Sequence, residues 1–298
     1  MKPAHRAEHA AHRSADAPQP DAAPAGRPFG DRRGEQVGWK DRLVSAGLWG
    51  VGATWMTAGM GAMMAAQTVL PPDRIEWLSR LYCRGQVLLT GSRWRAVVHP
   101  AVDPDAVYMF AQNHTNHFDH VVLYPATPHF KQGMELERHF RYPVYGWFMK
   151  QRGTIAVPEQ RSRRLELLYE RCKAEVDRGH SLLVFPEGTR TLDGRVGRFR
   201  TGVFEIARRL GIPVVPVAVT GSYEMMRKGS LLIRPGHTIT VHVEEPVPTE
   251  GLTRQDVPAL AERVRSVIAR RVDDYWAAKE REAARRQATS SARPARRR

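Results

Sequence analysis

The apolar residues in the middle and C-terminal parts of the chain fall into short runs separated by amphipathic stretches. Runs typical of buried strands lie at 94–98, 106–111, 154–157, 181–185, 214–219 and 238–243. Two stretches, 161–178 and 254–282, carry apolar residues at helical spacing, and Gly179 ends the first of them. Strands that alternate with helices predict an α/β domain in which helices flank a mixed β-sheet. We expect one such domain at 85–276.

The N-terminal part of the chain has a different pattern. Residues 1–40 are rich in Ala, Pro, Arg, Asp and His and show no apolar period, which is typical of a disordered arm. No charged residue occurs from Leu43 to Leu70, a run longer than the about 20 residues that cross a bilayer core. The run is rich in Gly, Ala and Met, so its hydrophobicity per residue is modest. A spanning helix, a re-entrant hairpin, an interfacial helix and a buried soluble helix all fit it.

A second helix is expected after Pro71 and Pro72, which end the apolar run. Asp73 can cap this helix, whose apolar and aromatic residues alternate with arginines up to Arg84. Such a helix suits a membrane interface, and an ordinary surface helix fits nearly as well. We therefore predict that residues 41–84 form a membrane-anchoring helical segment.

The charge balance indicates an anionic partner. The 46 Lys and Arg outnumber the 31 Asp and Glu, for a net charge of +15, which suits lipid headgroups, an acidic carrier protein or nucleic acid. Part of this excess lies at 277–298, a helix end and basic tail that fits either a disordered solubilising segment or a membrane tether. Cys83 and Cys172 have neither metal nor disulfide spacing, which favours a reducing compartment. No pattern of an RNA-binding sheet is visible, so no nucleic-acid partner is expected.

Two short motifs carry the candidate chemistry. Residues 113–119 read Asn-His-Thr-Asn-His-Phe-Asp, directly after a predicted strand, and residues 185–190 read Phe-Pro-Glu-Gly-Thr-Arg. The His-x-x-x-x-Asp spacing of the first motif arises easily by chance in a chain with 12 histidines. Six specified residues in a row do not, and a strand that ends in a Pro-Gly turn explains neither the Glu nor the Arg.

The order and surroundings of these motifs resemble the lysophosphatidic acid (1-acylglycerol-3-phosphate) acyltransferase family. Pro143-x-x-Gly146-Trp147, Gly153-Thr154-Ile155 and the stretch 199–219 extend the likeness, which spans roughly residues 80–248. The resemblance implies a phospholipid-biosynthesis enzyme that moves a fatty acyl group from acyl-CoA or acyl-carrier protein to the free hydroxyl of lysophosphatidic acid. It implies no metal and no tightly bound cofactor. Glycerol-3-phosphate, another lysophospholipid or a lyso-aminolipid are alternative acceptors.

His114 and Asp119 are the predicted catalytic pair. Acyl transfer to an alcohol needs the hydroxyl deprotonated as it attacks the thioester, and a histidine with a pKa near 6.5 is a natural general base. Asp119 can curl back to the other ring nitrogen, fix the tautomer and stabilise the imidazolium. The motif holds no serine nucleophile, which favours direct transfer over an acyl-enzyme.

The resemblance assigns the second motif to binding of the acceptor. Arg190 can bind a phosphate through two hydrogen bonds, which a lysine does less well. Gly188 lets the backbone approach the ligand closely, and Thr189 can donate a hydroxyl hydrogen bond. Glu187 is expected either to orient Arg190 or to bind an acceptor hydroxyl. Arg200 is expected either to complete the phosphate site or to be a plain surface residue.

The chain departs from the family pattern at two positions. Asn116 stands where the family usually has Ser, and Glu159 stands where it usually has an arginine. Arg161, Arg163 and Arg164 follow closely and could substitute for that arginine. The acceptor headgroup is therefore predicted less sharply than the reaction.

A metal site is the main chemical alternative. Residues 115–120 resemble the His-x-His-x-Asp-His motif of metallo-β-lactamase-type hydrolases, but Thr115 replaces the first His, so one ligand of the set is missing. His117 and His120 then read as helix or loop residues near the mouth of the site. A non-catalytic protein that binds its partner through charge alone is a second alternative, but it would not explain the motif at residues 185–190.

Location follows from the implied substrates. The acceptor and product are lipids and thioester donors are cytosolic, so we expect a membrane protein. The bacterial inner membrane, with the catalytic domain facing the cytoplasm, fits these substrates.

Overall fold

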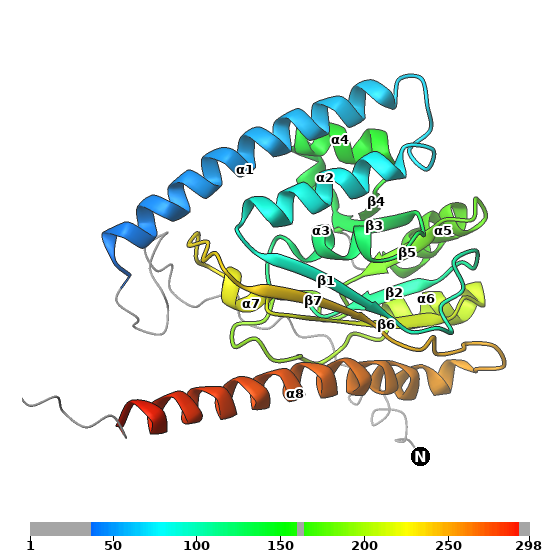
Figure 1. The fold of residues 1–298 in the computed structure, drawn as a ribbon. Coiled ribbons are helices and arrows are strands. Elements are labelled where there is room, and N and C mark those ends of the chain that lie inside the picture. Colours follow the sequence, from blue (N-terminus) through cyan, green and yellow to red (C-terminus); the bar gives the residue numbers. More distant parts are fainter. Residues whose placement is uncertain (1–36, 160–163, 292–298) are drawn as a thin grey trace, which may run out of the picture.

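Residues 37–159 and 164–291, which the computed structural model describes, contain one 7-stranded mixed sheet (Figure 1). Its strands are β1 (Arg93–Val98), β2 (Met109–Gln112), β3 (Lys131–Leu136), β4 (Ile155–Val157), β5 (Ser181–Val184), β6 (Val214–Thr220) and β7 (Thr238–Val243). The spatial order is β1-β7-β6-β2-β5-β3-β4. All neighbours pair in parallel except β6 and β7. The predicted α/β fold with a mixed sheet is confirmed, and the carboxyl ends of β2, β5 and β6 meet at one edge.

Six of the strands coincide with predicted apolar runs, and β3 was missed. Its sequence Lys-Gln-Gly-Met-Glu-Leu has no apolar run or alternation. The strand is nevertheless held between β5 and β4, and the Lys131 side chain is fully buried. The Lys131 ammonium donates to the carbonyl oxygens of Thr127 and His129, at 3.2 and 2.9 Å. These hydrogen bonds to the preceding turn compensate the burial of a polar residue, which a search for apolar runs cannot detect.

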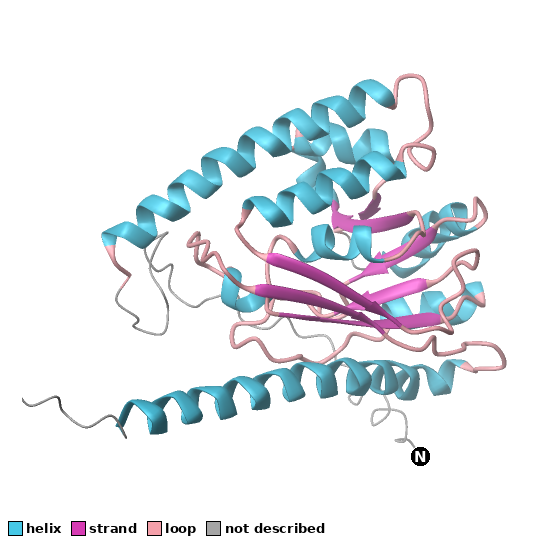
Figure 2. Cartoon of the chain, viewed as in Figure 1, coloured by secondary structure: helices cyan, strands magenta, loops and turns pink. Residues whose placement is uncertain are grey.

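Helices cover both faces of the sheet, as Figures 1 and 2 show. One face carries α1 (Trp39–Ala66), α2 (Glu76–Leu89), α3 (Asp119–Leu123) and α4 (Tyr145–Arg152). The other carries α5 (Arg164–Val176), α6 (Gly202–Leu210) and α8 (Val257–Ser291), while α7 (Ser222–Met225) follows β6 at the strand ends. Short 3₁₀ helices occur at 124–126, 137–141 and 254–256. Alternate residues of the central strands enter two hydrophobic cores, one on each face, as a period of two requires.

The N-terminal helices differ from what we expected. Among the described residues, no helix has both the length and the apolar character to cross a membrane, so the spanning transmembrane helix, one of the forms expected for 43–70, is not found. The run forms the single helix α1, whose many Gly and Ala residues contribute little apolar surface. These small residues serve close packing instead, because a Cβ at Gly59 would clash with the Tyr82 ring and one at Gly85 with the Trp55 ring. The predicted cap Asp73 is also wrong, since α2 begins at Glu76 with Ile75 before it.

The structure tests only part of the predictions for the two ends of the chain. The disordered arm predicted for residues 1–40 lies mostly outside the described residues, which begin at 37, and Trp39 already belongs to α1. At the other end α8 continues to Ser291, past the predicted helix end at 282. The last part of the basic tail, 292–298, lies outside the described residues.

Candidate active site

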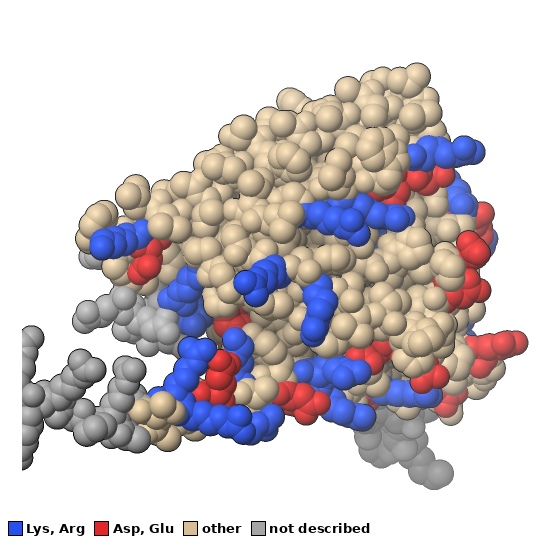
Figure 3. Space-filling model, viewed as in Figure 1, with Lys and Arg blue, Asp and Glu red and all other residues tan. Residues whose placement is uncertain are grey.

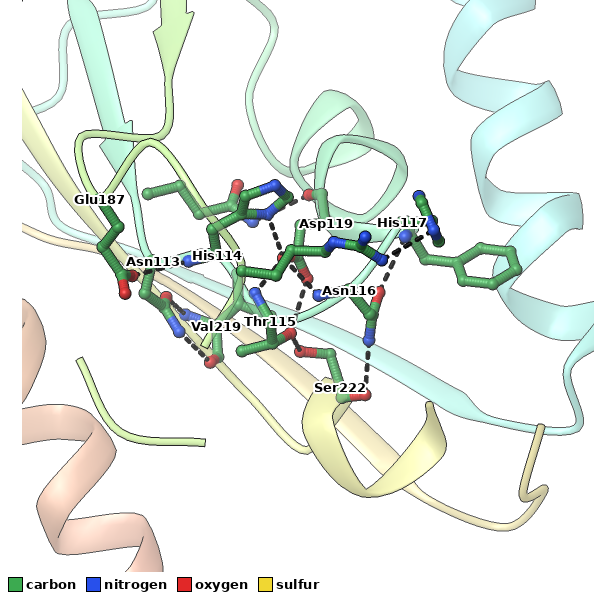
Figure 4. A network of polar contacts seen from close by, with 12 residues as sticks. Asn113, His114, Thr115, Asn116, His117, Asp119, Glu187, Val219 and Ser222 are labelled. Atoms are coloured by element: carbon green, nitrogen blue, oxygen red, sulfur yellow. Dashed lines mark hydrogen bonds and ion pairs between the residues drawn. The ribbon is translucent and has the colours of Figure 1, made fainter. Parts of the chain in front are cut away.

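The loop between β2 and α3 carries His114 at the carboxyl edge of the sheet. Asn113 extends the pairing of β2 with β6: its amide donates to the Val219 carbonyl at 3.0 Å and its Oδ1 accepts from the Val219 N–H at 2.7 Å. Gln112 donates to the carbonyl of Asp119 at 2.8 Å and so closes the loop. These side-chain hydrogen bonds replace the backbone hydrogen bonds of the sheet where β2 ends. They fix the position of His114, which follows directly (Figure 4).

His114 and Asp119 form the predicted pair. His114 Nδ1 lies 2.8 Å from Asp119 Oδ2, the carboxylate is fully buried and the imidazole is 23% exposed. The same carboxylate accepts the backbone N–H groups of Thr115 and Asn116 and the Thr115 hydroxyl. The carboxylate accepts from each of these donors and also faces His114 Nδ1, which places the ring proton on that nitrogen. Nε2 is then the ring nitrogen that can accept a proton from a substrate.

The departure Asn116 has a structural explanation. Its side chain is fully buried and donates to the Ser222 carbonyl at 2.6 Å, while its Oδ1 accepts from the Phe118 N–H at 2.8 Å. The Thr115 hydroxyl lies 2.8 Å from that of Ser222. The amide at 116 therefore ties the His114 loop to α7, and a serine is too short to reach both partners.

Glu187 accepts hydrogen bonds from two backbone N–H groups. Its Oε1 accepts from the backbone N–H of His114 at 2.9 Å, and its Oε2 accepts from that of Gly197 at 3.0 Å. The His114 carbonyl also accepts from the Thr191 N–H at 2.8 Å. Burial raises the pKa of Glu187 to about 7, against the two backbone hydrogen bonds that lower it. Glu187 thus joins the two motif loops and holds the backbone of His114 in place.

The rest of the second motif forms a cationic loop beside the base. Arg190 Nη1 lies 2.7 Å from His117 Nε2. Gly188 has φ of 66°, and a Cβ there would stand 2.8 Å from Nε of Arg200, so the guanidinium of Arg200 covers the glycine. The structure thereby brings all the predicted site residues into two adjoining loops.

Two residues of this region were missed as part of the site. The ammonium of Lys228 donates to the Thr189 hydroxyl at 2.9 Å, which adds a third cation to the loop. His117 was expected only near the mouth of the site. Nothing local in the sequence signals either contact, because the partners are 39 and 73 positions apart.

Of the residues proposed to replace the family arginine, the structure describes Arg164. Arg164 donates to the carbonyls of Pro158 and Glu159, at 2.7 and 3.1 Å, so its guanidinium is used within its own segment. Arg161 and Arg163 lie outside the described residues.

The alternative of a metal centre does not gain support from the side-chain geometry. Within 37–159 and 164–291, no three His, Cys, Asp or Glu side chains converge to hold a metal ion. His117 faces Arg190, and the ring of His120 packs at 6.3 Å from that of Tyr124. Burial lowers the pKa of both histidines, to about 4 for His117.

A mostly apolar pocket adjoins the base. Phe185 stacks on the His114 ring with centroids 4.2 Å apart, and Phe185 also lines the pocket. The walls come from α1, α2, α4 and the sheet, and include Met60, Met63, Tyr82, Phe148 and Leu183. The ring of Phe185 therefore connects the catalytic base with a pocket whose walls are mostly apolar.

Comparisons with known proteins agree with this geometry. The sequence profile of the Acyltransferase family matches residues 98–220. The chain is similar to a chloroplastic 1-acyl-sn-glycerol-3-phosphate acyltransferase of Brassica napus, with 33% identity over 148 residues, covering 50% of this chain and 42% of that protein. It is 32% identical over 174 residues to one of Arabidopsis thaliana, covering 58% and 47%. The human alpha enzyme is 44% identical over 82 residues, which cover 28% of this chain and 29% of that one.

The chain spans less than half the length of these curated relatives. Among solved structures it is similar to the 1-acyl-sn-glycerophosphate (LPA) acyltransferase PlsC from Thermotoga maritima, with a TM-score of 0.68 and 20% identity. That likeness covers 79% of this chain and 95% of the other and shows a common fold.

Proposed function

We propose that the chain, whose residues 98–220 match the Acyltransferase family profile, transfers a fatty acyl group from acyl-CoA or acyl-carrier protein to the free hydroxyl of lysophosphatidic acid, giving phosphatidic acid. The observation that carries the proposal is the contact of His114 with the buried carboxylate of Asp119, beside the cationic loop of the second motif. The names of the relatives at 31–44% identity support the 1-acylglycerol-3-phosphate type.

The chemistry follows from the free nitrogen of His114. Nε2 accepts the proton of the acceptor hydroxyl as the oxygen attacks the thioester carbonyl. Asp119 keeps the ring oriented and offsets the positive charge that develops on it. When the tetrahedral intermediate collapses, the carbon–sulfur bond breaks and the imidazolium returns its proton to the leaving thiolate. The base is restored and no covalent enzyme intermediate is formed.

The acceptor is held by its phosphate and the acyl chain by the apolar pocket. Arg190 and Arg200 belong to the loop after β5, and Lys228 contacts it at Thr189, so three cations gathered around one loop suit a phosphate dianion. The pocket behind Phe185 receives the apolar chain of one substrate. This arrangement puts the reacting hydroxyl and carbonyl next to His114.

We place the protein on a membrane surface, where its lipid substrates lie. Large apolar side chains are exposed along α1, α2 and α4, among them Trp39, Leu43, Trp77, Leu81 and Trp147 at 55–70% exposure. Figure 3 shows that the surface over α1 is almost free of charged side chains between its ends. An apolar face flanked by basic residues is typical of binding to anionic bilayers.

The test is an assay of the purified protein against a panel of acceptors with both donors. Transfer to lysophosphatidic acid well above transfer to glycerol-3-phosphate, another lysophospholipid and a lyso-aminolipid supports the proposal. A higher rate of transfer to one of these other acceptors identifies that acceptor as the substrate instead. Hydrolase activity that is lost on chelation, without acyl transfer, refutes the proposal.

A further inference from the structure

His117 joins the loop of the catalytic base to the guanidinium of the second motif. The 2.7 Å contact runs from Arg190 Nη1 to His117 Nε2 (Figure 4). A guanidinium can only donate, so the imidazole is the acceptor and carries its proton on Nδ1. This requires a neutral ring, and burial together with the charge of Arg190 lowers the pKa of His117 to about 4. The hydrogen bond therefore persists at neutral pH.

The contact with His117 leaves one edge of Arg190 untouched. A guanidinium presents two hydrogen-bonding edges to an anion, one formed by Nη1 and Nη2 and one by Nε and Nη2. The edge formed by Nε and Nη2 shares no atom with the His117 contact, so it can bind a phosphate through two hydrogen bonds while that contact persists. An arginine fixed in advance loses less conformational freedom when its ligand binds.

The anchor for this arrangement is rigid. His117 lies three positions after His114, in the loop that Asp119 and Asn116 hold through buried hydrogen bonds. The side chain that orients the phosphate-binding arginine and the side chain that takes the proton thus belong to one loop. Their separation sets the distance allowed between the phosphate and the reacting hydroxyl of an acceptor.

We propose that His117 is a positioning residue, which holds the Nε and Nη2 edge of Arg190 toward the phosphate of the acceptor. The inference rests on the proposed function, because it assigns the phosphate to Arg190. It gives His117 no part in the chemical step, since the ring contacts the guanidinium and the base is His114.

The experiment compares His117→Ala and His117→Gln in the full chain by steady-state kinetics. For His117→Ala we expect the acceptor KM to rise about tenfold, the size of one charge-assisted hydrogen bond, with kcat and donor KM little changed. Glutamine has an amide oxygen that can accept from Nη1, so His117→Gln should recover most of the affinity. In an Arg190→Ala background, His117→Ala should add no further rise, because it acts only through Arg190.

His242→Gln is a matched control, because His242 is a half-buried histidine of β7 whose pKa burial also lowers, and it should leave all parameters unchanged. An unchanged acceptor KM in His117→Ala overturns the proposal. So does an equal rise in the Arg190→Ala background, or a fall in kcat alone.

A binding measurement without catalytic turnover tests this inference independently of the proposed function. Calorimetry with lysophosphatidic acid in detergent micelles compares His114→Ala with the His114→Ala/His117→Ala double variant. Weaker binding by the double variant supports the positioning role even if the wild type transfers no acyl group to that acceptor, a result that would refute only the proposed reaction. Equal binding overturns the positioning role.

Discussion

Glu187→Gln should change how the stability of the protein depends on pH. Glu187 is 7% exposed, and burial raises its pKa from 4.5 to about 7. Because the folded pKa is higher than the unfolded one, the folded state binds more protons between these values, and its stability falls as pH rises through that window. At about 1.4 kcal/mol per tenfold change in proton affinity, the loss amounts to about 3 kcal/mol by pH 8.

Glutamine does not titrate, so Glu187→Gln should lack this part of the pH dependence. The free energy of unfolding, measured by denaturant titration at pH 5 and pH 8, gives the test. Relative to the wild type, the variant should gain about 2.5 kcal/mol between the two pH values, because the unfolded carboxyl is already mostly ionised at pH 5. The comparison cancels the other titrating groups, which both proteins share. A difference between the two proteins that stays constant from pH 5 to 8 would refute the raised pKa.

Three further predictions concern activity and location. His114→Ala should lower kcat by a hundredfold or more while the protein still folds, and a variant that keeps over about a tenth of the wild-type rate would contradict its role as base. Arg190→Lys should raise the acceptor KM about ten- to a hundredfold with the donor KM nearly unchanged, whereas a shift in donor KM would place Arg190 in the donor site. The double variant Trp77→Ser/Leu81→Ser should lower the fraction of protein that co-sediments with anionic vesicles and leave the activity on micellar acceptor unchanged. Binding that survives these changes and is lost in high salt alone would identify the basic tail as the tether.

Local chemistry accounts for what could be predicted from the sequence. A buried strand needs only an apolar run, so six of the seven strands of the described sheet were visible. The catalytic pair was predictable because His114 and Asp119 lie five positions apart in one turn, where this spacing alone brings their side chains within hydrogen-bonding distance. β3 was not, because Lys131 and Gln132 are buried polar residues whose hydrogen bonds go to the preceding turn and to Arg152, which no apolar run signals.

The sequence by itself determined the α/β fold, the two motifs and the pair formed by His114 and Asp119. The tertiary structure alone decided that Glu187 supports the backbone of His114, that His117 holds Arg190 and that Lys228 reaches Thr189. It also decided that the apolar N-terminal run packs as a helix against α2. The physical reason is the strand order: it places β2, β5 and β6 side by side, and loops far apart along the chain meet only where their strands end together.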